Sequence, residues 1–144
     1  MIDRYILDTV TLSKMTAQQR GSAFMRSYCR IPDEILLEAQ GLQDIVTLKL
    51  LDYPVTAVVL ENVIVVMATI RPEDKVVDLY TNKGNGDVML LATALTEMAI
   101  SSTQLFGDRW TIATDDNGLT LKAKELGIIT CRSPHLISLI GKTN

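Results

Sequence analysis

The sequence has few of the residues that build disulfide or zinc frameworks, since its 144 residues include two cysteines and one histidine. Cys29 and Cys131 are too few and too far apart for a disulfide scaffold, and a structural zinc site needs clustered thiolates. We therefore expect reduced thiols in a cytoplasmic protein. His135 lies in the C-terminal segment SPHLISLIG, where we expect a surface or packing role and no catalysis.

The sequence also lacks a basic excess and an apolar run long enough for a membrane. Its net charge is -3 and its isoelectric point is near 5.1, whereas a nucleic-acid groove usually makes a domain basic. The longest apolar stretch, residues 54–70, is shorter than the roughly 18–20 residues that span a bilayer and contains Glu61 and Asn62. The N-terminus has no apolar signal core. A polyanion would have to bind through a local site or through bound cations.

What the sequence does contain is the alternation of strands and helices typical of an α/β protein. With 47% apolar and 22% charged residues it is predicted to form a single globular domain over residues 1–144. Alternation of this kind favours a parallel sheet covered on both faces, so the prediction is a three-layer α/β/α sandwich with a central, mostly parallel sheet. The expected strands are 4–8, 110–114 and 128–131, and the expected helices are 16–28, 32–41, 43–52, 55–70, 87–100 and 118–127.

Several acids fall where such a sheet binds ligands. Asp8 closes the first expected strand, and Asp115 and Asp116 follow the strand WTIAT. Ligands bind outside the carboxyl ends of parallel strands, so these acids are expected at the functional edge. Asp87 follows the turn KGNG and begins a helix that returns toward the same sheet. Glu38 is expected on the apolar face of its helix, between Ile35 and Leu42, where a carboxylate needs a partner.

Each acid alone has an ordinary explanation, because aspartate is a favoured helix cap and glutamate is common on surfaces. Four converging acids without neighbouring cations would repel one another, however, and would raise some of their pKa values. Oxygen ligands suit hard cations, so Mg²⁺ or Mn²⁺ would relieve the repulsion. Two such ions would activate a water and stabilise the leaving oxygen of a phosphodiester without a histidine or cysteine nucleophile.

The segments YILDTVTL, IPDEILLEAQ, GNGDVMLLATAL and TIATDDNGLTLKAKELGI, in that order and spacing, resemble the PIN-domain nucleases and in particular the VapC-like toxins of toxin-antitoxin pairs. The likeness spans residues 4–131. The family's four acids match Asp8, Glu38, Asp87 and Asp116, and these residues are therefore the expected catalytic and metal-binding set. Pro32 and Glu34 depart from the family pattern, so Glu34 stays an alternative to Glu38.

The resemblance implies a single PIN-like domain with Mg²⁺- or Mn²⁺-dependent endoribonuclease activity on RNA, often as a homodimer and often inhibited by a small antitoxin protein. Thr9 and Thr114 are expected to position ligands or phosphate through their hydroxyls, and Asp115 is expected to assist the metal ligands indirectly. Lys83 and Arg109 are candidates for binding RNA phosphates.

Two other functions stay open. The acids could serve as helix caps in a catalytically silent protein-interaction module, or the chain could be an RNA-processing nuclease that has no antitoxin. Other phosphate chemistries fit less well, because no Lys-Ser/Thr follows GNG as a P-loop requires. Val10 also stands where a haloacid-dehalogenase-type phosphatase has its second aspartate, and the adjacent acid pair lies too late in the chain for a response-regulator receiver.

Overall fold

A single parallel sheet forms the centre of the structure, which is a computed structural model and describes residues 1–76 and 85–143. Five strands lie in the order β3-β2-β1-β4-β5, all parallel to their neighbours. They are β1 (Asp3–Leu7), β2 (Cys29–Pro32), β3 (Asp52–Tyr53), β4 (Arg109–Ala113) and β5 (Ile129–Cys131). The chain builds β2 and β3 on one side of β1 and then returns to add β4 and β5 on the other. The strand order therefore reverses between β1 and β4.

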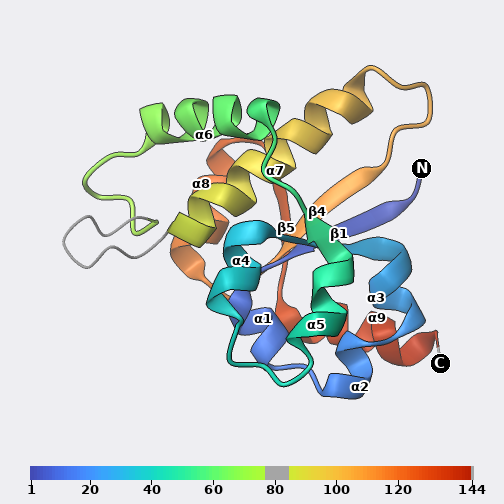
Figure 1. The fold of residues 1–144 in the computed structure, drawn as a ribbon. Helices are drawn as coiled ribbons and strands as arrows, with labels where there is room; N and C mark the ends of the chain where they lie inside the picture. The colour runs from blue at the N-terminus through green and yellow to red at the C-terminus, as the bar shows by residue number, and fades with distance from the viewer. Residues whose placement is uncertain (77–84, 144) are drawn as a thin grey trace.

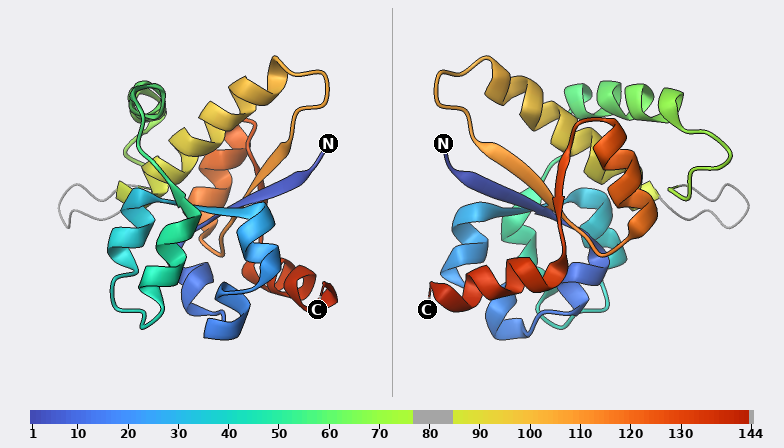
Figure 2. Two further views of the ribbon diagram at one scale, coloured as in Figure 1. Left: turned by 45° about the vertical axis from the view of Figure 1, so that its right-hand side comes forward. Right: turned by 180° about the vertical axis from the view of Figure 1, so that it is seen from behind.

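Helices cover both faces of this sheet, with α7 and α8 on one face and α1, α2, α3 and α9 on the other (Figure 2). This arrangement confirms the predicted three-layer α/β/α sandwich. The helical elements are α1 (Thr9–Ser13), α2 (Ala17–Arg20), α3 (Ala23–Tyr28), α4 (Asp33–Glu38), α5 (Ile45–Leu48), the 3-10 turn η1 (Lys49–Leu51), α6 (Ala57–Thr69), α7 (Asn85–Ser102), α8 (Asn117–Glu125) and α9 (Ser133–Lys142).

The long helix α7 is the main packing element between β4 and α6 (Figure 1). Leu90 and Leu91 are fully buried, as are Ile6 of β1 and Ile112 of β4. The expected helix over residues 87–100 is therefore confirmed, although it begins two residues earlier, at Asn85. Because α7 is apolar around most of its circumference, it can pack against the sheet on one side and against α6 on the other.

The first half of the chain differs from the prediction in five places. The helix α1 was not predicted, and the helix expected over residues 43–52 is divided into α5 and η1 and ends where β3 begins. Residues 16–28 form two helices because Ser22 accepts a hydrogen bond from Met25 N and so starts a new helix after Gly21. The helix expected over 32–41 already ends at Glu38. Two short strands, β2 and β3, were not predicted; neither has the length or alternation that marks a strand, and both depend on pairing with their neighbours.

The valine-rich run over residues 55–70 is a helix, as expected, and begins after the Thr56 cap, which accepts from Val59 N. This helix, α6, lies on the far side of α7 from the sheet (Figures 1 and 2). Val59 and Val66 face α7 and are buried, whereas Ile64 is 70% exposed. Among the residues that the structure describes, no helix is long and apolar enough to cross a bilayer.

Candidate active site

Asp8 and Asp116 lie at the point where the strand order reverses. Asp8 follows β1, Asp116 follows β4 by three residues, and these two strands are neighbours with Leu7 paired to Ala113. The fully buried Thr114 joins the two acids, because its hydroxyl donates to Oδ2 of Asp8 and accepts from the Asp116 backbone N–H at 3.1 Å. The crevice outside the carboxyl ends at such a reversal is the usual ligand site of an open parallel sheet.

Glu38 reaches the same edge from the last turn of α4. The hydroxyl of Thr9, the residue after Asp8, donates to Oε2 of Glu38 over 2.5 Å. The start of α7 also lies against Glu38, since a Cβ at Gly86 would stand 2.6 Å from Oε1 of Glu38 and 2.9 Å from Cδ1 of Ile35. A larger residue there would displace the ends of these two side chains. Contrary to expectation, Glu38 is exposed at the rim and not buried on the apolar face of α4, because α4 ends at this residue.

Asp87, in the first turn of α7, is the acid whose pKa is raised by burial and by the charges of the other three. Burial raises its pKa from the usual 3.8 to about 7, and the charges of Asp116, Asp8 and Glu38 add to the rise. These three acids come from different elements, so only the tertiary fold brings their charges to Asp87. Glu38, and not Glu34, is among the acids that shift Asp87, which favours Glu38 over Glu34 as the second acid of the set.

The donor chemistry of this set fits a hard divalent cation, because a carboxyl group such as Asp87, whose pKa is raised by burial and by three neighbouring acids, gains most from a bound positive charge. Two of the four carboxylates are already engaged in hydrogen bonds to backbone N–H groups, however. Asp8 Oδ1 accepts from Thr11 N and Asp116 Oδ1 accepts from Leu119 N, as helix caps do. In the described part of the chain, no three His, Cys, Asp or Glu side chains already form a group that could hold a metal ion. Metal binding would require these side chains to turn toward one another.

The raised pKa of Asp87 predicts a pH-dependent stability for the metal-free protein. Because the folded pKa of about 7 exceeds the unfolded 3.8, the folded chain holds the proton longer, and the free energy of unfolding falls as pH rises between these values. Asp87→Asn is expected to remove this decline and to stabilise the metal-free protein by on the order of 3 kcal/mol at pH 8. Urea unfolding of both chains from pH 4 to pH 8, with a chelator present, measures the difference. Parallel pH profiles would contradict the prediction.

Asp115 faces away from the four acids and ties neighbouring elements together. Its Oδ2 contacts Lys14 Nζ at 2.5 Å, and its carboxylate also accepts from Ser133 N and Ser133 Oγ. The hydrogen bond from Lys14, followed by those from Ser133, lowers the pKa of Asp115 to about 2. The two adjacent aspartates therefore have different roles. Asp116 caps α8 beside the other acids, and Asp115 links α1 to the start of α9.

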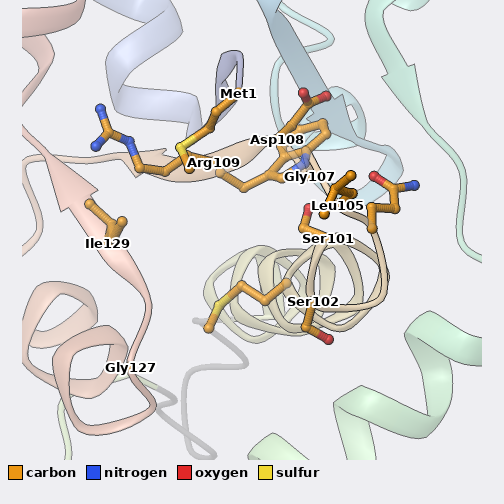
Figure 3. A pocket seen from close by; sticks show the side chains of 12 residues that line it. Met1, Ser101, Ser102, Leu105, Gly107, Asp108, Arg109, Gly127 and Ile129 are labelled. Carbon is orange, nitrogen blue, oxygen red and sulfur yellow. The ribbon is translucent and has the colours of Figure 1, made fainter.

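The structure places one of the two residues expected to bind RNA phosphates. Lys83 lies outside the described residues. Arg109 begins β4 and is paired with Asp3 at 2.7 Å, at the end of the sheet opposite to the acids, so its assignment to the functional edge is wrong. It lines a separate hollow of about 460 Å³ together with Met98 and Ile129 (Figure 3). The error arose because a strand of five residues separates Arg109 from the edge that its sequence neighbours reach.

Sequence reasoning overlooked two cations that do lie at the acidic edge. Lys14 follows α1, which begins directly after Asp8. Arg132 follows β5 and donates from Nη1 to the Asp115 carbonyl at 2.6 Å and from Nη2 to Oδ1 of Asn117 at 2.8 Å. The position of Arg132 immediately after a predicted strand was the available signal, because every residue in that position of a parallel sheet reaches the same edge.

The remaining candidate nucleophile at this edge is a poor one. Burial, and then the charge of Asp115, raises the pKa of the Cys131 thiol to about 11, so the thiol stays protonated at neutral pH. His135 is exposed on α9, in agreement with its expected surface role. The edge therefore offers carboxylate oxygens, threonine hydroxyls and a guanidinium.

A comparison of the sequence with protein-family models finds no match, and a comparison with curated proteins finds none either.

Proposed function

We propose that this protein is a metal-dependent endoribonuclease of the PIN type that hydrolyses RNA phosphodiester bonds. The observation that carries the proposal is the set of four carboxyl groups at the reversal of strand order, three of which raise the pKa of the fourth, Asp87. Structural acids are usually paired with a base, whereas an acid whose pKa is raised by burial and by neighbouring acids is typical of a functional site. Order and spacing of the four motifs agree with this family.

In this proposal Asp8, Glu38, Asp87 and Asp116 hold Mg²⁺ or Mn²⁺. A cation held by them would supply the positive charge that favours activation of a water and departure of the leaving oxygen. Thr114 orients Asp8, and Thr9 orients Glu38, through the hydroxyl hydrogen bonds that they donate. Asp87 would lose its proton more readily beside a bound cation, because the positive charge would offset the repulsion from the other acids.

The partners proposed with this activity are an RNA substrate, a second copy of the chain and a small antitoxin, in the cytoplasm. Support for a protein partner comes from α6, whose outward surface is apolar although its inner side already packs on α7. Uncovered apolar patches on small proteins commonly mark protein interfaces. The exposed apolar side chains of α6 are Val58, Leu60, Ile64, Val65 and Met67. Growth arrest on expression, relieved by a small companion protein, would separate a toxin from an RNA-processing nuclease without an antitoxin.

A catalytically silent interaction module is the second candidate, and the caps at Asp8 and Asp116 favour it. Both carboxylates accept a backbone N–H in the first turn of the following helix, which is the ordinary structural use of aspartate. The raised pKa of Asp87 has no such explanation. Asp87 lies in the first turn of α7, where an acid is ordinarily favourable, but in a module without a bound cation the charges of the other three acids would oppose its ionisation.

Binding of Mn²⁺ distinguishes the two functions. At a hundredfold excess over Kd the ion is expected to stabilise the native nuclease by about 2.7 kcal/mol, which raises Tm by about 8 °C. Asp87→Asn should abolish most of that rise. Differential scanning fluorimetry with and without Mn²⁺, together with cleavage of a fluorescent single-stranded RNA before and after chelation, makes both measurements.

Two results would refute the nuclease. One is a Tm that is the same with and without Mn²⁺, as the silent module predicts. The other is RNA cleavage that continues undiminished after all divalent ions have been removed. Asp3→Asn serves as the matched control in both assays, because Asp3 lies on β1 at the end of the sheet remote from the four acids.

A further inference from the structure

The guanidinium of Arg132 lies against the loop that presents Asp116. Its Nη1 donates to the carbonyl of Asp115 and its Nη2 donates to the side chain of Asn117, which are the residues on either side of Asp116. A guanidinium held at two points has a defined plane and direction. Arg132 is therefore a fixed cation beside one of the four acids.

The backbone of Arg132 is held as firmly as its side chain. The next residue, Ser133, is fully buried and begins α9, and both its N–H and its hydroxyl donate to the Asp115 carboxylate. Lys14 contacts the same carboxylate from the end of α1. Three elements that meet at this edge thus share one carboxylate, and Arg132 stands at their junction.

Within residues 1–76 and 85–143, the positive charge of Arg132 is not balanced by a carboxylate at this junction. Lys14 and Asp115 compensate one another in an ion pair. Among the described residues, Arg132 makes no ion pair with a carboxylate, and its two recorded acceptors are a carbonyl and an amide oxygen, both neutral. A guanidinium has five N–H donors, so three of them are not used in these two bonds. The side chain is exposed and open to a ligand.

We propose that Arg132 binds a phosphate of single-stranded RNA next to the phosphate that is cut at the four acids. The inference rests on the proposed nuclease function and names the residue by which an acidic protein holds its polyanionic substrate. Planar, bidentate donors match phosphate oxygens, and the positive charge offsets the repulsion between RNA and this acidic edge. Arg132 is thus a substrate-binding residue, while the carboxylates perform the metal chemistry.

The test compares Arg132→Gln and Arg132→Lys with the wild-type chain on a single-stranded RNA oligonucleotide. Arg132→Gln is expected to raise KM about tenfold at low salt with kcat within about twofold, because the lost contact serves binding. The plot of log KM against log salt should become shallower by about 0.7, the value for one phosphate contact on a single strand. Arg132→Lys keeps the positive charge but loses the two-pronged guanidinium, so its KM should lie between that of the wild-type chain and that of Arg132→Gln. Arg109→Gln is the matched control at the opposite end of the sheet.

The Mn²⁺-induced rise in Tm separates failure of this inference from failure of the nuclease. Arg132→Gln should keep that rise, and Arg132→Lys tests the same contact if the glutamine variant does not fold. If the wild-type chain cuts RNA and both variants match its KM and its salt slope, Arg132 does not bind phosphate and only this inference is overturned. If the wild-type chain neither binds nor cuts RNA, the inference and the nuclease are overturned together.

Discussion

Asp8→Asn and Asp116→Asn are each expected to lower the rate of metal-dependent RNA cleavage by at least about a hundredfold while leaving the fold intact. Asparagine is as good a helix cap as aspartate, so the bonds that Thr11 N and Leu119 N donate should survive in the variants. What the substitutions remove is the negative charge needed to hold a divalent cation. Initial rates on a fluorescent RNA, at Mg²⁺ concentrations from micromolar to tens of millimolar, measure the loss.

The Tm of each metal-free variant serves as the folding control and should lie within a few degrees of the wild-type value. Asp3→Asn, which changes the same residue type at the other end of β1, should cut RNA at the wild-type rate. Unchanged cleavage by both Asp8→Asn and Asp116→Asn would show that these carboxylates only cap helices, and the proposed mechanism would have to be withdrawn.

The largest expected loss of stability follows Lys122→Met. Lys122 is 2% exposed, and its Nζ contacts the carbonyl of Thr69 at 2.7 Å and carboxylate oxygens of Asp74 and Glu125 at 2.8 Å. The variant loses all three contacts of the buried ammonium, although Asp74 and Glu125 keep Arg71 as a partner, so we expect about 2 kcal/mol of lost stability and a Tm about 6 °C lower. Thermal unfolding followed by circular dichroism at pH 7 measures the change.

The pH dependence of that loss identifies its cause. The hydrogen bond from Lys122 is the largest influence that lowers the pKa of Asp74 to about 2. Because the folded pKa lies below the unfolded 3.8, this contribution is present above pH 4 and disappears as pH falls toward 2, so the two chains should converge in acid. Lys124→Met on the exposed side of α8 should change stability by less than about 0.5 kcal/mol. A Lys122→Met chain as stable as that control would refute the assignment.

The positions of Asp8 and Asp116 could be predicted from the sequence because both depend on local pattern. Each follows an apolar, β-prone run by a few residues, and parallel strands deliver whatever follows them to one edge. Asp87 was recognised in the same way, as an acid at the start of a strongly apolar helix. Arg109 was assigned to the wrong end of the sheet because it is close in sequence to Asp115 and Asp116. It begins β4, however, whereas those acids follow the end of that strand.

By itself the sequence determined the alternation of strands and helices, the buried helix α7 and the acids that follow β1 and β4, because periodicity, capping residues and strand ends are properties of neighbouring residues. Only the tertiary structure decided that β2 and β3 exist, that Glu38 and not Glu34 acts on Asp87, and that Arg132 stands beside Asp116. These features depend on strand pairing, on the close approach at Gly86 and on contacts between segments far apart in the chain. Such long-range contacts form only when the whole core packs, so no local pattern encodes them.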